Sequence, residues 1–237
     1  MTTGFGFWFD AVALVNLIVC WLGYTWYASY KGKETPCLSS VLALYRRDWM
    51  LRLLNRDNRI ADASLLSSLR ASVSFFASTS ILVMAGLITG IAASEQAVGV
   101  LSTLPFVATT TRELWESKVL VMLITFVYSF FEFTWSLRLY NFTCVIMGSA
   151  PLEDEVKDND IEKQIFARRT GHIMTLAANH FNYGLRAYYF ALATMSWFIH
   201  PALFMVSAFV VVVILYRREF HSSVLDALAV SDKEAHL

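Results

Sequence analysis

Long apolar stretches separated by polar segments organise this chain. A helix needs roughly 20 apolar residues to cross a hydrocarbon core of about 30 Å. Four stretches reach that length, at residues 5–27, 71–93, 119–140 and 184–216. Trp8 and Trp26 flank the first stretch, as aromatic residues do at membrane interfaces. The pattern predicts an all-α membrane bundle of about four transmembrane helices, built as a single domain over residues 1–237.

Two polar segments, residues 28–70 and 148–183, are expected to be cytoplasmic loops. Positive charge follows the first span and none precedes it, which predicts an outside, periplasmic N-terminus. Within the first loop, apolar residues recur every three or four positions after Pro36, which indicates an amphipathic helix. Its basic flank predicts contact with anionic lipid through Arg46, Arg47 and Arg52.

The last apolar stretch, residues 184–216, has 33 residues, which is too long for one untilted crossing. His200-Pro201 interrupts it. The stretch is either one long kinked helix or two pieces that form a re-entrant or doubly crossing hairpin at this point. A bundle of four crossings is the prediction, and it places Arg217, Arg218 and Lys233 outside, whereas a hairpin returns them inside.

Small residues line one side of the second span. Ser74 and Ser78 share that side, and Gly86 with Gly90 forms a GxxxG element. Helices in lipid associate by close packing, which small residues permit. These four residues are therefore predicted to mediate helix packing.

The third span carries two charged residues, Glu132 and Arg138, within the stretch FFEFTWSLRLYN. Six helical positions correspond to 600° of rotation, so the two side chains point about 120° apart and cannot pair on one helix. Glu132 shares a side with hydroxyl residues, namely Thr125, Ser129, Ser136 and Thr143. Arg138 shares another side with Thr134 and Asn141. Two polar sides predict a helix near the centre of the bundle.

A longer row of mostly polar residues follows in steps of three and four. It consists of His172, Thr175, Asn179, Asn182, Arg186, Tyr189, Ala193, Ser196 and His200. The row predicts a helix that carries a polar seam from the loop into the membrane. A charge at membrane depth costs at least about 2.5–3.5 kcal/mol, so Arg186 should be paired, with Glu132 or Asp10 as partner, or lie in a wet cavity. An ionic clasp and a transport or gating role both fit the seam.

Composition removes other classes of function. The chain is 57% hydrophobic and 16% charged, with a formal charge of zero, so nucleic acid is not an expected partner. The three cysteines and the histidines lack metal-ligand spacing, and neither nucleotide-binding nor hydrolase motifs occur. No metal, cofactor or catalytic residue is predicted, and nothing favours an enzyme.

Several runs resemble a known family. They are SFFASTSILVMAGL, FFEFTWSLRLYNF followed by GSAP, and NHFNYGLRAYYFALATMSWF followed by HP. In these runs and their spacing the chain resembles domain-of-unknown-function family 599 (DUF599), small integral membrane proteins of bacteria and plants. The resemblance implies a multi-pass protein of the bacterial inner membrane and no established reaction. The positions that match its motif blocks are Glu132, Trp135, Arg138, Asn141, Asn182, Gly184, Arg186, Tyr188 and Tyr189.

The polar rows favour a homo-oligomeric channel or transporter-like protein for a small ion or solute. In this hypothesis the row from His172 to His200, together with Glu132, surrounds a water-filled path. A non-catalytic accessory or scaffold subunit of a membrane complex is the first alternative, and dry, paired seams would favour it. A lipid- or quinone-binding membrane protein is the second.

Overall fold

The structure is a computed structural model that describes residues 3–101, 111–156 and 159–234. These residues are almost all helical and contain no strand, which confirms the all-α prediction. The first span is α1 (Thr3–Ile18), a π-helical turn η1 (Val19–Gly23) and α2 (Tyr24–Glu34), which follow one another without a break. Next come α3 (Leu38–Leu54), the long α4 (Ile60–Ala92) and the short α5 (Ser94–Leu101).

The second half of the chain begins with α6 (Arg112–Gly148) and α7 (Glu153–Val156). It continues with α8 (Asp160–Thr194), a 3₁₀ turn η2 (Met195–Phe198), α9 (Pro201–Phe220) and α10 (Ser223–Glu234). Helices long and apolar enough to cross a membrane lie at Trp8–Gly32, Ile60–Ala92, Arg112–Gly148 and Pro201–Leu228. A bundle of about four such helices is therefore confirmed.

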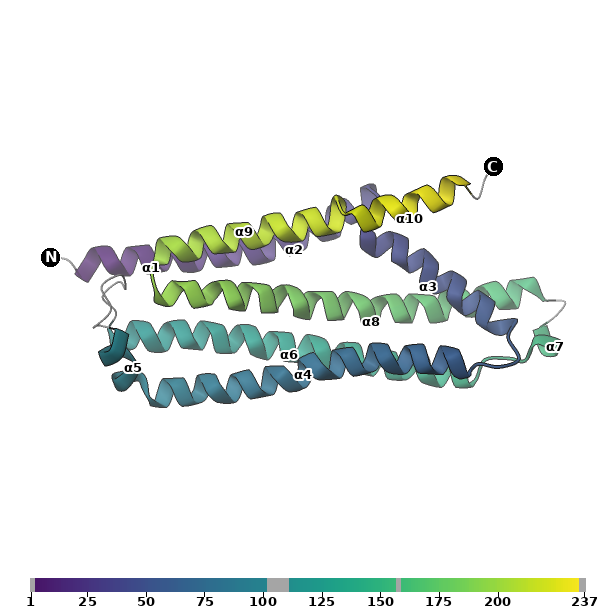
Figure 1. The fold of residues 1–237 in the computed structure, drawn as a ribbon, viewed down its shortest axis with the longest axis horizontal. Coiled ribbons are helices and arrows are strands. Elements are labelled where there is room, and N and C mark those ends of the chain that lie inside the picture. The colour runs from purple at the N-terminus through teal and green to yellow at the C-terminus, as the bar shows by residue number, and fades with distance from the viewer. Residues whose placement is uncertain (1–2, 102–110, 157–158, 235–237) are drawn as a thin grey trace.

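The long helices lie side by side, and α8 runs between α6 with α4 on one side and α9 with α1 and α2 on the other (Figure 1). One end of this bundle carries α3 and α7 and the basic residues around them, and we name it the basic end. The other end carries the N-terminus, α5 and η2, and we name it the N-terminal end. At 37 residues, α6 is about 55 Å long, so it extends beyond a hydrocarbon core of about 30 Å.

Residues 184–216 do not form one continuous helix. The chain leaves α8 at Thr194, turns through η2 and starts α9 at Pro201, with His200 as N-cap. Proline suits the first turn of a helix because it has no N–H to satisfy there. The turn lies at the N-terminal end, and α9 runs back toward the basic end (Figure 1). The chain therefore follows the hairpin alternative and not one long kinked helix, and the number of membrane crossings stays a prediction.

Most of the predicted loop at residues 148–183 is helical, because α8 starts at Asp160 and packs along α6. Hydroxyls of the Glu132 side of α6 make the contact. Ser129 donates a hydrogen bond to the carbonyl of Gly184 (2.9 Å), and Ser136 donates to that of Ala177 (2.7 Å). A Cβ at Gly184 would lie 2.5 Å from the Phe133 ring, so glycine is needed for this close approach. The predicted central position of α6 follows from these bonds.

The corner between α3 and α4 is held by a buried carboxylate. Asp62, in the first turn of α4, is fully buried and accepts a hydrogen bond from the Trp49 indole N–H (2.5 Å). Its second partner is the guanidinium of Arg56. Met50 and Leu53 of α3 are also buried in the core that α3 shares with α4, α6 and α8. The amphipathic helix therefore packs on the bundle.

Most of the small-residue side of α4 is exposed, including Ser74, Ser78 and Gly86. A Cβ at Gly86 or Gly90 would meet nothing within 4 Å. The face of α4 that packs on α6 carries larger residues such as Val73, which is buried. Gly90 meets α6 only through its carbonyl, which accepts a hydrogen bond from the Trp115 indole N–H (3.4 Å). Helix packing through these four residues stays a prediction.

Residues 94–117 contain only one basic residue, Arg112, and are therefore predicted to form an outside loop. Residues 102–110 of this loop lie outside the described residues.

Candidate functional site

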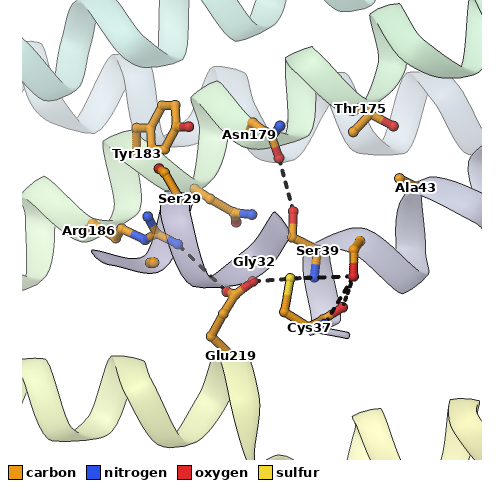
Figure 2. Close-up of a pocket in the computed structure, with 13 residues that line it drawn as sticks. Ser29, Gly32, Cys37, Ser39, Ala43, Thr175, Asn179, Tyr183, Arg186 and Glu219 are labelled. Atoms are coloured by element: carbon orange, nitrogen blue, oxygen red, sulfur yellow. Dashed lines mark hydrogen bonds and ion pairs between the residues drawn. The ribbon is translucent and has the colours of Figure 1, made fainter. Parts of the chain in front are cut away.

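A cavity of about 310 Å³ lies where α2 and α3 meet α8 and α9 (Figure 2). The residues that line it are mostly small or polar. They are Ala28, Ser29, Gly32, Cys37, Ser39, Ser40, Ala43, Thr175, Asn179, Asn182, Tyr183, Arg186 and Glu219. Four residues of the predicted polar row thus face one space, which we name the polar cavity.

Two opposite charges lie side by side in the wall of the polar cavity. Arg186 Nη2 of α8 lies 3.7 Å from Glu219 Oε2 of α9 (Figure 2). Both side chains are largely shielded, at 11% and 17% exposed. The rings of Tyr24 and Tyr183 lie 5.3 and 5.7 Å from the guanidinium carbon. Arg186 therefore pairs with Glu219, and neither of the two predicted partners, Glu132 and Asp10, fills that position.

The start of α3 closes one side of the polar cavity. The Ser39 hydroxyl donates to Asn179 Oδ1 of α8 (3.1 Å), and its backbone N–H donates to Glu219 Oε1 (3.3 Å). Cys37 and Ser40 form the cap of α3 beside it. The free N–H groups at a helix start favour a carboxylate there, so α3 helps to hold Glu219 in place.

Other members of the polar row are satisfied inside the chain. Tyr189 accepts a hydrogen bond from Arg218 (3.2 Å), and Ser196 lies 2.7 Å from Ser207 of α9. His200 caps α9 by accepting from the backbone N–H of Ala202 (3.1 Å). His172 is exposed and lies in the wall of a different hollow near α7. Apart from His172, the row therefore faces α3 and α9 of its own chain.

The two charges of α6 find separate environments. Glu132 Oε2 accepts a hydrogen bond from His180 Nδ1 of α8 (2.7 Å). Arg138 lies over the rings of Trp135 and Phe142, at 5.9 and 5.7 Å from their centres. Asn141 is exposed. The side chains of Glu132 and Arg138, predicted to point about 120° apart, thus contact two different sets of residues.

A buried ionic cluster fixes the N-terminal end. Lys118 of α6 is 3% exposed, and its Nζ lies 3.2 Å from Asp10 Oδ1 of α1. The indole N–H of Trp197 donates to the same oxygen (2.6 Å), and Lys118 donates to the Trp197 carbonyl (3.2 Å). These three residues tie α1 and α6 to the η2 turn, and we name them the end clasp.

Sequence reasoning missed Glu219, His180 and Lys118. Glu219 follows Arg217 and Arg218 beyond the expected end of the last span. A carboxylate in such a segment is expected to be solvated, so it was not predicted to pair with a buried charge. His180 lies outside the predicted polar row of α8, and Lys118 lies just before the predicted third span. The useful signal was the number of buried charges, because each charge at membrane depth requires a partner from another helix.

The three arginines predicted to contact anionic lipid have different positions on α3. Arg46 is half-buried, its Nη1 lacks a partner among the described residues, and burial lowers the pKa of its guanidinium while nearby Tyr140 raises that pKa. Arg47 is exposed and donates to Gln164 of α8 (2.9 Å). Arg52 is exposed.

In the described part of the chain, no three His, Cys, Asp or Glu side chains are placed to hold a metal ion.

A bundle of membrane-length helices with a polar cavity and buried ion pairs defines the class: an α-helical integral membrane protein. The chain belongs to the family described as "Protein of unknown function, DUF599", whose model matches residues 12–224. The family assignment predicted from the sequence motifs is confirmed. No curated protein and no solved structure matches the chain.

Proposed function

We propose that this protein is transporter-like and binds a small polar solute, with both a positive and a negative group, in the polar cavity. The observation that carries the proposal is the Arg186–Glu219 pair in a wall that is otherwise small and polar. Ligand pockets typically measure about 300–1,000 Å³, so a cavity of about 310 Å³ suits a solute of few heavy atoms.

The geometry of the pair supports a zwitterion. Charge-assisted hydrogen bonds are typically about 2.7–2.9 Å long, so a separation of 3.7 Å leaves both ions without their best partner. A carboxylate on the solute would bind the Arg186 fork, and an ammonium group would bind Glu219. Hydroxyls and amides, such as those of Ser29 and Asn182, supply further hydrogen-bonding groups in the wall.

One side of the polar cavity is closed by packed apolar residues. From Arg186 toward the N-terminal end come Phe190 and Ala193 of α8 and Trp197 of η2, which are all buried. Trp197 stacks on Phe204 of α9 (4.9 Å between ring centres), and the end clasp lies beside it. A route across the membrane would require this layer to open, which is the behaviour of a transporter that exposes its site to one side at a time.

Charge supports an orientation in which the basic end is cytoplasmic. Lys31 and the arginines of α3 lie at that end, and basic residues concentrate on the cytoplasmic side of membrane proteins. The N-terminus then lies outside, in the periplasm of a bacterial inner membrane. Because α9 returns to the basic end, Arg217 and Arg218 are cytoplasmic in this orientation. The predicted homo-oligomer stays a prediction.

A non-catalytic accessory or scaffold subunit is the second candidate, and one observation favours it. The end clasp and the Glu132–His180 pair are closed within one chain, as expected of charges that fix the arrangement of helices. If the Arg186–Glu219 pair has a purely structural role, added solutes should not change the unfolding midpoint of the protein. This expectation distinguishes the second candidate from the first.

Thermal unfolding of the detergent-solubilised protein tests the proposal. The probes are glycine, L-alanine and glycine betaine, with acetate and methylammonium as the two halves of glycine. We expect at least one zwitterion to raise the unfolding midpoint by more than either half does, because binding to the folded state stabilises it. Arg186→Gln and Glu219→Gln should each abolish this increase.

The matched controls are Arg168→Gln and Glu34→Gln, which remove the same charges at exposed positions outside the polar cavity. They should keep the full increase. The proposal is wrong if no zwitterion raises the midpoint of the wild-type protein, or if the increase survives in both cavity variants.

A further inference from the structure

A second hollow lies on the surface of α6, away from the polar cavity. Its volume is about 410 Å³, and it is lined by Phe131, Glu132, Thr134, Trp135, Arg138 and His180. All but His180 come from α6, from the stretch whose two charges point to different sides. We name it the Arg138 pocket.

Its depth places it at a membrane–water boundary. Arg138 follows Lys118 of the end clasp by 20 residues, which corresponds to about 30 Å of helix, the thickness of the hydrocarbon core. Lys118 pairs with Asp10, near the start of the first span. Arg138 therefore lies at the headgroup level of the basic end.

The free charge of the Arg138 pocket is positive. Among the described residues Arg138 has no carboxylate partner, and its guanidinium contacts the aromatic rings of Trp135 and Phe142. Glu132 lines the same pocket, but its side chain is 16% exposed and is bonded to His180 of α8. The carboxylate is thus satisfied inside the bundle, whereas the guanidinium faces outward.

The surroundings of Arg138 are apolar and exposed. The exposed fractions are 64% for Phe131, 44% for Trp135 and 42% for Phe142. An exposed aromatic surface beside a basic residue is typical of the membrane interface, where rings contact acyl chains and the charge reaches the headgroups. A free phosphate ion in water would gain nothing from these rings.

We infer that the Arg138 pocket binds the phosphodiester of an anionic glycerophospholipid from the leaflet at the basic end, with an acyl chain along Phe131. The planar guanidinium can donate two parallel hydrogen bonds to phosphate oxygens. Cytoplasmic leaflets are rich in anionic lipids, which suits the proposed orientation. The site is separate from the polar cavity and does not depend on solute binding there.

Thermal unfolding with added lipid tests this inference. Phosphatidylglycerol and phosphatidylcholine with identical acyl chains are added to the delipidated protein in detergent, and glycerol phosphate serves as the soluble probe. We expect phosphatidylglycerol to raise the midpoint more than phosphatidylcholine does, and glycerol phosphate to have no effect. In Arg138→Gln the shift with phosphatidylglycerol should fall to the phosphatidylcholine value.

The control is Arg168→Gln, which removes the same charge from an exposed arginine of α8 outside the Arg138 pocket. It should keep the phosphatidylglycerol shift. Native mass spectrometry gives a second readout that does not depend on baseline stability: Arg138→Gln should retain one phosphatidylglycerol molecule fewer than the wild type. Equal losses in both variants, an unchanged shift in Arg138→Gln, or a full effect of glycerol phosphate would each overturn the inference.

Discussion

Three buried charges of this bundle pair with side chains of other helices. Lys118 meets Asp10 of α1, Glu132 meets His180 of α8, and Arg186 meets Glu219 of α9. The three pairs differ in tightness, since the closest approach is 2.7 Å for Glu132–His180 and 3.7 Å for Arg186–Glu219. The pair with the longest separation lies in the polar cavity. A solute bound there would gain most by supplying a closer partner to each ion.

The end clasp should be a strong contributor to stability. Asp10→Asn keeps an oxygen for the Trp197 indole but leaves Lys118 buried without a counter-charge. Removing one partner of a buried ion pair typically costs about 3–5 kcal/mol. We expect a large drop in the free energy of unfolding, measured by chemical denaturation in detergent. The double variant Asp10→Asn/Lys118→Gln should recover a substantial part of it, and equal losses in the single and double variants would contradict this role.

Gly184 should be sensitive to the addition of one methyl group. In Gly184→Ala the new Cβ meets the buried Phe133 ring, and overpacking of this kind typically costs about 1–3 kcal/mol. Gly90→Ala is the matched control, because a Cβ there meets nothing within 4 Å and alanine favours a helix by about 0.5–1 kcal/mol. Unfolding midpoints should fall in the first variant and hold or rise in the second. Equal midpoints would disprove the close contact.

The sequence predicted which residues of α6 and α8 are polar neighbours, but it could not supply their partners. Helical periodicity fixes the relative direction of Ser129 and Ser136 around one axis, and both do face a neighbouring helix. It does not fix how that axis is rotated against another helix. Glu219 was therefore beyond reach, because its place beside Arg186 depends on the direction in which α9 returns.

At the scale of whole elements, α8 is the helix that sequence patterns describe least well. Its polar residues let residues 160–183 pass for a loop, although the helix is about 52 Å long and lies between α6 and α9. Because protein surrounds it, α8 can carry residues such as Asn179 and Arg186 that a lipid-facing helix could not. Hydropathy reports contact with lipid, so it finds the helices with long apolar stretches and misses α8.

The hairpin between α8 and α9 makes a prediction about sidedness. Single cysteines are introduced at Thr35 between α2 and α3, at Ser223 at the start of α10, and at Gln96 in α5. In a background that lacks the three native cysteines, a membrane-impermeant maleimide should label positions 35 and 223 from the same side of sealed vesicles. Position 96 should react from the other side. Labelling of 35 and 223 from opposite sides would restore the arrangement of four crossings.

The whole molecule combines a tightly packed part with a more open one. α4, α6 and α8 share a core with α3, and α1, α2 and α9 form a second cluster with the end of α8. The polar cavity adjoins the second cluster, since Ala28 and Cys37 belong to both. In a transporter-like cycle, α1, α2 and α9 would move together against α8. The end clasp would have to open for this motion.

A solute site in a transporter-like protein must be open to one side of the membrane at a time. Asn182→Cys, in a background without the three native cysteines, places one thiol in the cavity wall. We predict that a membrane-impermeant thiosulfonate reagent reacts with it from the basic side of sealed vesicles and not from the other side. A zwitterion that raises the unfolding midpoint should slow this reaction. Equal reaction from both sides would indicate an open channel, and no reaction from either side would indicate a dry, structural seam; each result would contradict the account.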